Sequence, residues 1–330
     1  MSSKFTIEEV ETIEDWQKFA QTSLQYTMFV SSVYLKTFGG KYKTFFVKKG
    51  IETKAGFCIL LSDDEKDIVL NELVIYSGIL FQNDKFKKEV KARSERFEIT
   101  ETIIDYITKA YENIEIALTP QVDDMRPFIW HNYGSTKIDK KFNLDLRYTS
   151  YIDISELKNI ENEEDTTIFK SLETLRQRNI RKARKEDSVT VEELTVSLFL
   201  KFYVDLMHKQ NETVSKEKLD NMLNIIENTV NNNQAVMLAT KNNKEEIIYL
   251  AVFSFDKHRA YYLFGAGNPE SKEVYKGTIC FWDGFIKLAN DYNIKEVDME
   301  GVNSPSRGWF KLSFGGGLRS YYEVKLEQNK

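Results

Sequence analysis

Hydrophobic and polar positions along the chain predict an ordered series of strands and helices. Residues 4–11 alternate apolar and polar side chains, as in a strand with one buried face. Helical spacing follows over 15–22 and over 29–38, where Gly39-Gly40 is a stop signal. The first half then continues with three strand-like runs, a helix and a further strand, at 43–49, 56–61, 67–73, 96–112 and 114–118.

The second half repeats this order. A strand over 148–154 precedes three helices (166–187, 196–210, 215–231), three strands (234–240, 246–256, 259–267), a helix over 277–293 and strands over 295–300 and 319–327. The halves overlay without a gap at an offset of 181 residues (277 − 96), which also places Arg126-Pro127-Phe128 on Arg307-Gly308-Trp309. We infer a duplicated β-α-α-β-β-β-α-β-α-β unit, with domains at 1–147 and 148–330.

Composition and charge exclude several classes of protein. The chain has 330 residues, 42% of them hydrophobic, and a formal net charge of −5, so it is neither disordered nor a general nucleic-acid binder. Two cysteines and three scattered histidines predict neither a disulfide framework nor a metal site. The start lacks a signal-peptide pattern, and no window approaches 18 uninterrupted apolar residues. We therefore expect a cytoplasmic protein without a transmembrane segment.

The order of three antiparallel strands, a helix and a strand is that of the GNAT acyltransferase fold. A doubled unit resembles the Fem family, peptidyltransferases that add amino acids from aminoacyl-tRNA to peptidoglycan precursors, and the related GNAT-like N-acyltransferases. The segment Lys311–Gly316 looks like the family's FK-x-x-FGG motif, and Asp298–Gly301 looks like its acidic strand end. Residues 124–133 followed by 147–155 resemble its domain junction. The resemblance implies an α+β (α/β) fold of two tandem GNAT-like domains, each a mixed, mostly antiparallel sheet flanked by helices.

The predicted catalytic residues are Lys311, Glu300 and Asp298, and the resemblance implies the role of Lys311. Attack of an amine on an ester or thioester places negative charge on the carbonyl oxygen, which a fixed cation at Lys311 would stabilise. The family lysine has this role or binds a substrate phosphate. Asp298 and Glu300 alternate at the end of a predicted strand and so point to opposite faces. One of them would orient or deprotonate the attacking amine, and Glu300, nearest the break at Gly301, is the better candidate. Two structural alternatives stay open: a surface Lys311 packed on Trp309 or Phe314, and a Glu300 paired with Lys295 or Arg307.

Other residues are assigned to binding. Lys276-Gly277-Thr278 begins the helix whose N-terminus binds the coenzyme pyrophosphate in GNAT enzymes, unless Gly277 merely caps a turn. Arg176 falls within the apolar face of 166–187, so it must pair or reach a cavity, where it would contact a phosphate or carboxylate. The remaining predicted substrate contacts are Arg307, Trp309, Phe314, Gly315 and Tyr262.

Two further features have both a binding and a structural interpretation. Asp124 and Arg126 suit an anionic group on the acceptor, or form a pair that fixes the domain junction. The basic face of 166–187, with Arg178, Arg181 and Arg184, either binds phosphates or is simply solvated. In the first copy Arg96 and Trp130 replace Gly277 and Lys311, which places the chemistry in the second domain and leaves the first to shape the acceptor cleft.

We therefore expect an N-acyltransferase that moves an acyl or aminoacyl group from an activated donor to a primary amine, without a covalent enzyme intermediate. Acyl-CoA and aminoacyl-tRNA are the candidate co-substrates, and no tightly bound cofactor is expected. The expected partners are a small-molecule amine, on a cell-wall precursor or an amino sugar, together with tRNA or an acyl carrier protein. The alternatives are a non-catalytic binding module that keeps the fold, and an RNA-binding protein that uses the basic helix.

Overall fold

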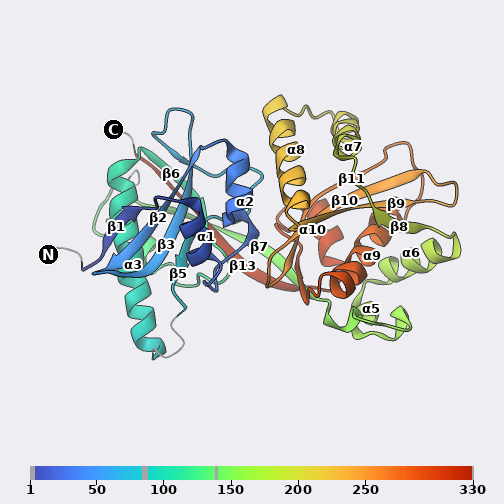
Figure 1. Cartoon of the computed structure of the whole chain (residues 1–330), viewed down its shortest axis with the longest axis horizontal. Helices are drawn as coiled ribbons and strands as arrows, with labels where there is room; N and C mark the ends of the chain where they lie inside the picture. The colour runs from blue at the N-terminus through green and yellow to red at the C-terminus, as the bar shows by residue number, and fades with distance from the viewer. Residues whose placement is uncertain (1–3, 84–87, 138–139, 329–330) are drawn as a thin grey trace. The chain divides into compact units, whose positions relative to one another are not determined.

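The structure, a computed structural model, describes residues 4–83, 88–137 and 140–328 (Figure 1). The chain forms two units: Met1–Arg147 with Ser320–Lys330, and Tyr148–Arg319. The segment 320–330 therefore belongs to the first unit and not to the second domain, where the sequence analysis placed it. The reason is strand pairing, because β13 (Gly317–Glu327) lies antiparallel to β6 (Asn113–Ala117) of the first unit.

The first unit is built on a mixed sheet. Strands β1 (Thr6–Glu9), β2 (Tyr42–Lys49) and β3 (Glu52–Leu61) are antiparallel, and β3 also pairs with β4 (Ile68–Val69) and β5 (Gly78–Phe81). β4 continues in parallel to β6. The helices of this unit are α1 (Ile13–Ala20), α2 (Ser32–Leu35), α3 (Glu89–Ala110) and α4 (Arg126–Trp130).

Two helices cover opposite faces of this first sheet. Phe45 of β2 stacks on Phe57 and contacts Tyr106 of α3, with ring centroids 5.4 Å apart in the second pair. The next residue, Phe46, contacts Phe19 in α1. Because successive side chains of a strand point to opposite faces, α1 and α3 lie on different sides of the sheet.

The second unit has the same plan. Strands β8 (Val189–Glu192), β9 (Ala235–Lys241), β10 (Ile247–Phe255) and β11 (Ala260–Gly267) are antiparallel. β11 then pairs in parallel with β12 (Glu296–Asp298), which pairs antiparallel with β7 (Asn143–Asp153). The helices are α5 (Thr167–Ser171), α6 (Thr174–Lys185), α7 (Val196–Lys209), α8 (Lys216–Asn231), α9 (Lys276–Asp291) and α10 (Pro305–Leu312).

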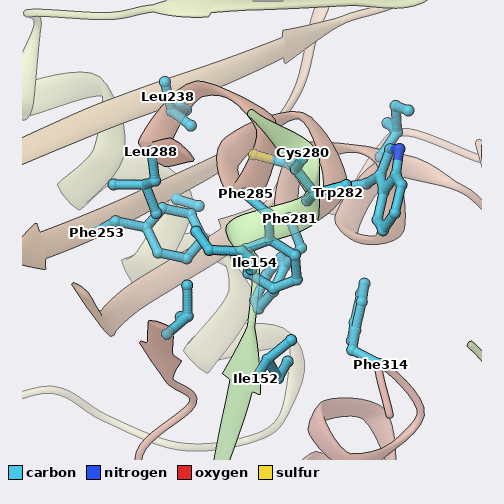
Figure 2. Packing of buried hydrophobic residues seen from close by; sticks show 14 of the residues in the cluster. Ile152, Ile154, Leu238, Phe253, Cys280, Phe281, Trp282, Phe285, Leu288 and Phe314 are labelled. Atoms are coloured by element: carbon cyan, nitrogen blue, oxygen red, sulfur yellow. The ribbon is translucent and has the colours of Figure 1, made fainter. Parts of the chain in front are cut away.

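Helix α9 contributes more buried residues to the core of the second unit than any other helix. It packs on β9, β10 and β11, and ten of its residues are buried. Figure 2 shows its side chains Cys280, Phe281, Trp282, Phe285 and Leu288 among residues of the sheet. Gly284 permits this close approach, since a Cβ there would lie 2.9 Å from the Phe253 ring.

Several predicted elements differ from the observed ones. The helix expected at 29–38 is broken at Ser31, whose extended backbone and side-chain bond to the Tyr34 amide start a new helix. The helix expected at 166–187 is broken at Leu172, which is extended and separates α5 from α6. The predicted strand 67–73 shrinks to β4, and the sequence analysis missed β5 and β8. The predicted repeat unit has a helix of unstated bounds before its last strand, and α4 and α10 occupy that place. β5 is buried on both faces and so lacks the alternation that marks a half-buried strand.

The helix α10 supports the internal repeat. Residues 126–130 of α4, shifted by 181, become 307–311, which lie inside α10. Within the described ranges, no helix has the length and apolar character needed to cross a membrane.

Candidate functional site

Strands β11 and β12 separate soon after they meet. They pair only at Ala260–Val297 and Tyr261–Asp298, so β11 continues from Tyr262 without β12 beside it. β11 also contains a bulge, because Val252 of β10 faces Phe264 while Phe253 faces Tyr262, which leaves Leu263 as the extra residue. The predicted strand 295–300 thus ends at Asp298.

Asp298 fixes the turn after β12. It is fully buried, and it accepts hydrogen bonds from the Thr149 hydroxyl on β7 and, at 2.7 Å, from the Glu300 amide. Because both contacts are internal to the protein, the carboxylate of Asp298 shapes the backbone that carries Glu300.

Glu300 is in an unusual position for a carboxylate. Its backbone has a left-handed φ of 54°, its side chain is 5% exposed, and its Oε1 atom has no hydrogen-bond partner. Burial raises the pKa of the Glu300 carboxyl well above its usual range; the Lys311 ammonium opposes this shift, and Asp298 adds to it. When ionised, the Glu300 carboxylate is therefore a stronger base than an ordinary surface carboxylate.

Lys311 points inward from α10. The helix starts at Pro305 and packs tightly at Gly308, where a Cβ would lie 2.5 Å from the Val302 carbonyl oxygen. The Lys311 ammonium donates to the Gly301 carbonyl at 3.3 Å and lies 5.2 Å from the centroid of the Tyr262 ring. The surface alternative for this lysine is therefore wrong.

The Lys311 and Glu300 charges influence each other at a distance. Burial lowers the pKa of the Lys311 ammonium, whereas Glu300 and Asp298 raise it and Arg307 lowers it further. In the described part of the chain, no ion pair of 4.0 Å or less joins Glu300 to Lys311, Lys295 or Arg307. A cation and a carboxylate thus share one buried region without neutralising each other by direct contact.

Arg176, a residue of α6, contacts the N-terminal end of α9. Its Nη1 donates to the Thr278 hydroxyl at 2.6 Å, and its guanidinium lies 4.9 Å from the centroid of the Phe310 ring. The Nε atom is buried without a hydrogen-bond partner. Burial lowers the pKa of Arg176, and Glu173 opposes this shift. A half-buried cation at the positive end of a helix dipole is electrostatically unfavourable alone, and an anionic ligand would relieve it.

The other residues at the start of α9 have structural contacts. Lys276 donates to the carbonyls of Asn268 at 2.7 Å and Ser271 at 3.0 Å, so its ammonium holds the loop after β11. Gly277 has little room for a side chain, since a Cβ would lie 3.2 Å from the Tyr249 ring and 3.4 Å from Phe310.

The remaining predicted contacts of the second unit lie at different depths. Arg307, one helical turn before Lys311, is exposed, and so is Trp309, with 69% of its surface accessible. Phe314 is fully buried and stacks on Phe281, so it belongs to the core. Gly315 has a φ of 84° and packs against Ser171.

Asp124 and Arg126 form a two-pronged ion pair in the first unit. Nε and Nη2 of Arg126 donate to the two carboxylate oxygens of Asp124 at 2.7 and 2.6 Å, and the guanidinium lies over Phe97 and Trp130. Hydrogen bonding to Arg126 lowers the pKa of Asp124. These contacts agree with the structural alternative for the pair, and they leave the guanidinium partly exposed.

The basic face of α6 is partly neutralised. Arg181 pairs with Glu164 at 2.6 Å, Lys182 with Glu186 at 3.6 Å, and Arg184 with both Glu163 and Asp283. Such pairing offsets part of the positive charge that the RNA-binding alternative requires. The described residues contain no group of three or more His, Cys, Asp or Glu side chains that could hold a metal ion.

Sequence reasoning missed four residues of this region: Thr149, Tyr249, Gly265 and Phe310. Thr149 lies 149 positions from its partner Asp298, and no sequence signal connects them. Gly265 had a readable signal, because a glycine inside a strand pattern marks a bulge or a close backbone approach.

No protein-family model and no curated protein matches the sequence. Solved structures match over nearly the whole chain. FemX has a TM-score of 0.62 at 12% identity, with 96% of each chain covered. A tandem GNAT protein from the clavulanic acid biosynthesis pathway has a TM-score of 0.54 at 9% identity, with 97% of each chain covered. L-PGS from Bacillus licheniformis has a TM-score of 0.52 at 10% identity, covering 96% of this chain and 92% of that one.

Identities this low establish a fold and not an activity. The structural matches confirm the predicted α+β fold. The chain has the tandem GNAT-like fold that FemX and the clavulanic acid pathway protein also have.

Proposed function

We propose that this protein is an N-acyltransferase that transfers an acyl or aminoacyl group from an activated donor to a primary amine, with the chemistry in the second unit. The observation that carries the proposal is the Lys311 ammonium, held where β11 and β12 separate, near a buried carboxylate that does not neutralise it. Fold similarity to acyltransferases supports the reaction class.

The reaction needs one cation and one base. The amine nitrogen attacks the carbonyl carbon of an ester or thioester, and negative charge develops on the carbonyl oxygen. Lys311 stabilises that charge, a contribution of about 10²–10³ in kcat for one such donor. The new C–N bond forms, and the ionised form of Glu300 accepts the proton of the attacking amine. Glu300 then passes this proton to the leaving group as the C–O or C–S bond breaks. Asp298 positions Glu300 through its amide.

Two arginines are assigned to anionic groups of the substrates. Arg176, at the start of α9, would contact a phosphate or carboxylate, since its Nε has no partner and its charge is half-buried. Arg126 would contact an acceptor in the first unit through the edge that Asp124 does not occupy. Acyl-CoA, an acyl carrier protein and aminoacyl-tRNA are the candidate donors, and a cytoplasmic cell-wall precursor or amino sugar is the candidate acceptor.

A transfer assay tests the proposal. The protein is incubated with labelled acetyl-CoA or with mixed aminoacyl-tRNA and a panel of amines that includes amino sugars and cell-wall precursors, and amide products are detected by mass spectrometry. Lys311→Met should lower the rate by about 10²–10³. The matched control Lys244→Met removes an exposed lysine of the β9–β10 turn and should leave the rate unchanged.

Ribonuclease treatment separates the donors. Loss of product after treatment identifies aminoacyl-tRNA, whereas persistence identifies a thioester. The proposal is wrong if a product forms at the same rate with Lys311→Met, or if none of the donors yields an amide.

A further inference from the structure

We infer that Tyr262 is a positioning residue, whose ring holds the Lys311 ammonium away from Glu300 and is itself kept in place by Gly265. The catalytic meaning of this inference rests on the proposed function, whereas its structural content can be measured without any substrate.

The partners of the Lys311 ammonium are both neutral. The ring centroid of Tyr262 lies 5.2 Å from Nζ, and the Gly301 carbonyl oxygen lies 3.3 Å away. A cation over an aromatic face is attracted by the negative face of the ring, which favours one position of a flexible side chain. Contact with Glu300 would neutralise the ammonium, whereas contact with a ring leaves its full charge for a developing oxyanion.

The Tyr262 ring has little freedom to move. Its centroid lies 4.4 Å from that of Phe281 and 5.7 Å from that of Phe253. Burial raises the pKa of Tyr262 well above its usual range, and the neighbouring Tyr249 and Glu300 raise it further, so the ring remains a neutral phenol. A neutral, packed ring is a fixed partner for the ammonium at any physiological pH.

Gly265 determines where the Tyr262 hydroxyl lies. Residues three apart in a regular strand face opposite sides, but the extra residue Leu263 brings Tyr262 and Gly265 to the same side of β11. A Cβ at position 265 would overlap the Tyr262 hydroxyl and lie 2.7 Å from the Tyr249 hydroxyl. Any side chain there must displace the ring that supports Lys311.

Ring-current shifts in NMR spectra report this contact directly. The full chain is labelled with ¹³Cε-lysine, and the Lys311 cross-peak is assigned by its absence in Lys311→Met. Protons of a group over an aromatic face resonate upfield, so the Lys311 ε-CH₂ signal should lie upfield of the exposed lysines. Tyr262→Phe keeps the ring and should keep the shift, whereas Tyr262→Leu should abolish it.

Gly265→Ala provides a second test, because the added methyl group must displace the Tyr262 ring. It should move the Lys311 signal toward those of exposed lysines, while the control Gly317→Ala, where a Cβ meets no atom within 4 Å, should not. A Lys311 signal among those of the exposed lysines in the unmodified protein overturns the inference, and so does an upfield shift that survives Tyr262→Leu.

The two proposals can fail separately. Absence of amide product with any donor, combined with the expected upfield shift, contradicts only the proposed function. If transfer is found, Tyr262→Leu should lower kcat more than it changes KM, and Tyr262→Phe should restore most of the rate.

Discussion

Glu300 combines two costs that most residues avoid. A left-handed backbone at a residue other than glycine costs about 1–3 kcal/mol, and a buried polar atom without a partner costs about as much again. Asp298 and Thr149 offset part of this cost by holding the turn. Such costs concentrate where a side chain must meet a ligand, which is the role proposed for Glu300.

The raised pKa of Glu300 predicts how stability changes with pH. A carboxyl with a raised pKa holds its proton in the folded state at a pH where the unfolded chain has lost it, so folding becomes less favourable as the pH rises above about 4.3. The Glu300→Gln variant has no ionisable group at this position, so its stability does not fall in this way. The variant should gain stability relative to the unmodified protein as the pH rises above about 4.3, by at most about 1.4 kcal/mol per pH unit, until Glu300 ionises in the folded state as well. Urea unfolding at several pH values measures the difference, and a constant difference would contradict the shift.

The sequence predicted which residues carry charge at this site but not their surroundings. Lys311, Glu300 and Asp298 were chosen from two short motifs, and all three are buried or partly buried in one region of the second unit. The contact between Lys311 and Tyr262 depends on α10, for which the repeat unit predicted a helix but no bounds, and on a bulge that no periodicity reveals.

At the scale of elements, one ion network joins three segments of the second unit. Arg184 of α6 donates to Glu163 at 2.9 Å and to Asp283 of α9 at 2.6 Å, and Trp282 donates to the same Glu163 carboxylate. Burial raises the pKa of Asp283, and the Arg184 guanidinium opposes this shift. The arginine therefore holds two close carboxylates together.

Removing the Arg184 guanidinium should weaken the packing of α6 on α9. Arg184→Met leaves both carboxylates without their shared cation and should lower the free energy of unfolding by about 2 kcal/mol, less than for a fully buried pair because the arginine is partly exposed. Arg178→Met, on the exposed side of the same helix, should change it by less than about 0.5 kcal/mol. Thermal unfolding compares the two, and equal effects would rule out the network as a source of stability.

Long, strongly periodic elements were the most predictable. The helix 277–293 and the strands 234–240, 246–256 and 259–267 agree closely with α9, β9, β10 and β11. The short strands β5 and β8 escaped prediction, and the helix at α4 was predicted without bounds, because four or five residues hold too little of a period and form only through their neighbours.

At the scale of the whole molecule, most of the C-terminal strand β13 belongs to the first unit. Val324 is fully buried in the core of that unit beside residues of α3 and β6. Val324→Asp places a carboxylate in this core and should destabilise it by about 4 kcal/mol. Hydrogen exchange followed by mass spectrometry should show faster exchange in β3, α3 and β6, with α9 and β10 unchanged.

The control for this prediction lies on the same strand. Leu318→Asp alters an exposed residue of β13 within the second unit and should leave exchange in both units unchanged. Faster exchange confined to the second unit in Val324→Asp would contradict the assignment of β13.

The pairing of β13 with β6 also sets an order of events during protein synthesis. Ribosomes make Ser320–Glu327 only after the entire second unit has been translated, so β6 lacks its antiparallel neighbour throughout that time. An unpaired strand edge can join other chains, and nascent domains usually complete themselves from the N-terminus onward. Here the N-terminal unit is finished last, and a chain whose translation stalls would expose an open sheet edge to chaperones or to other nascent chains.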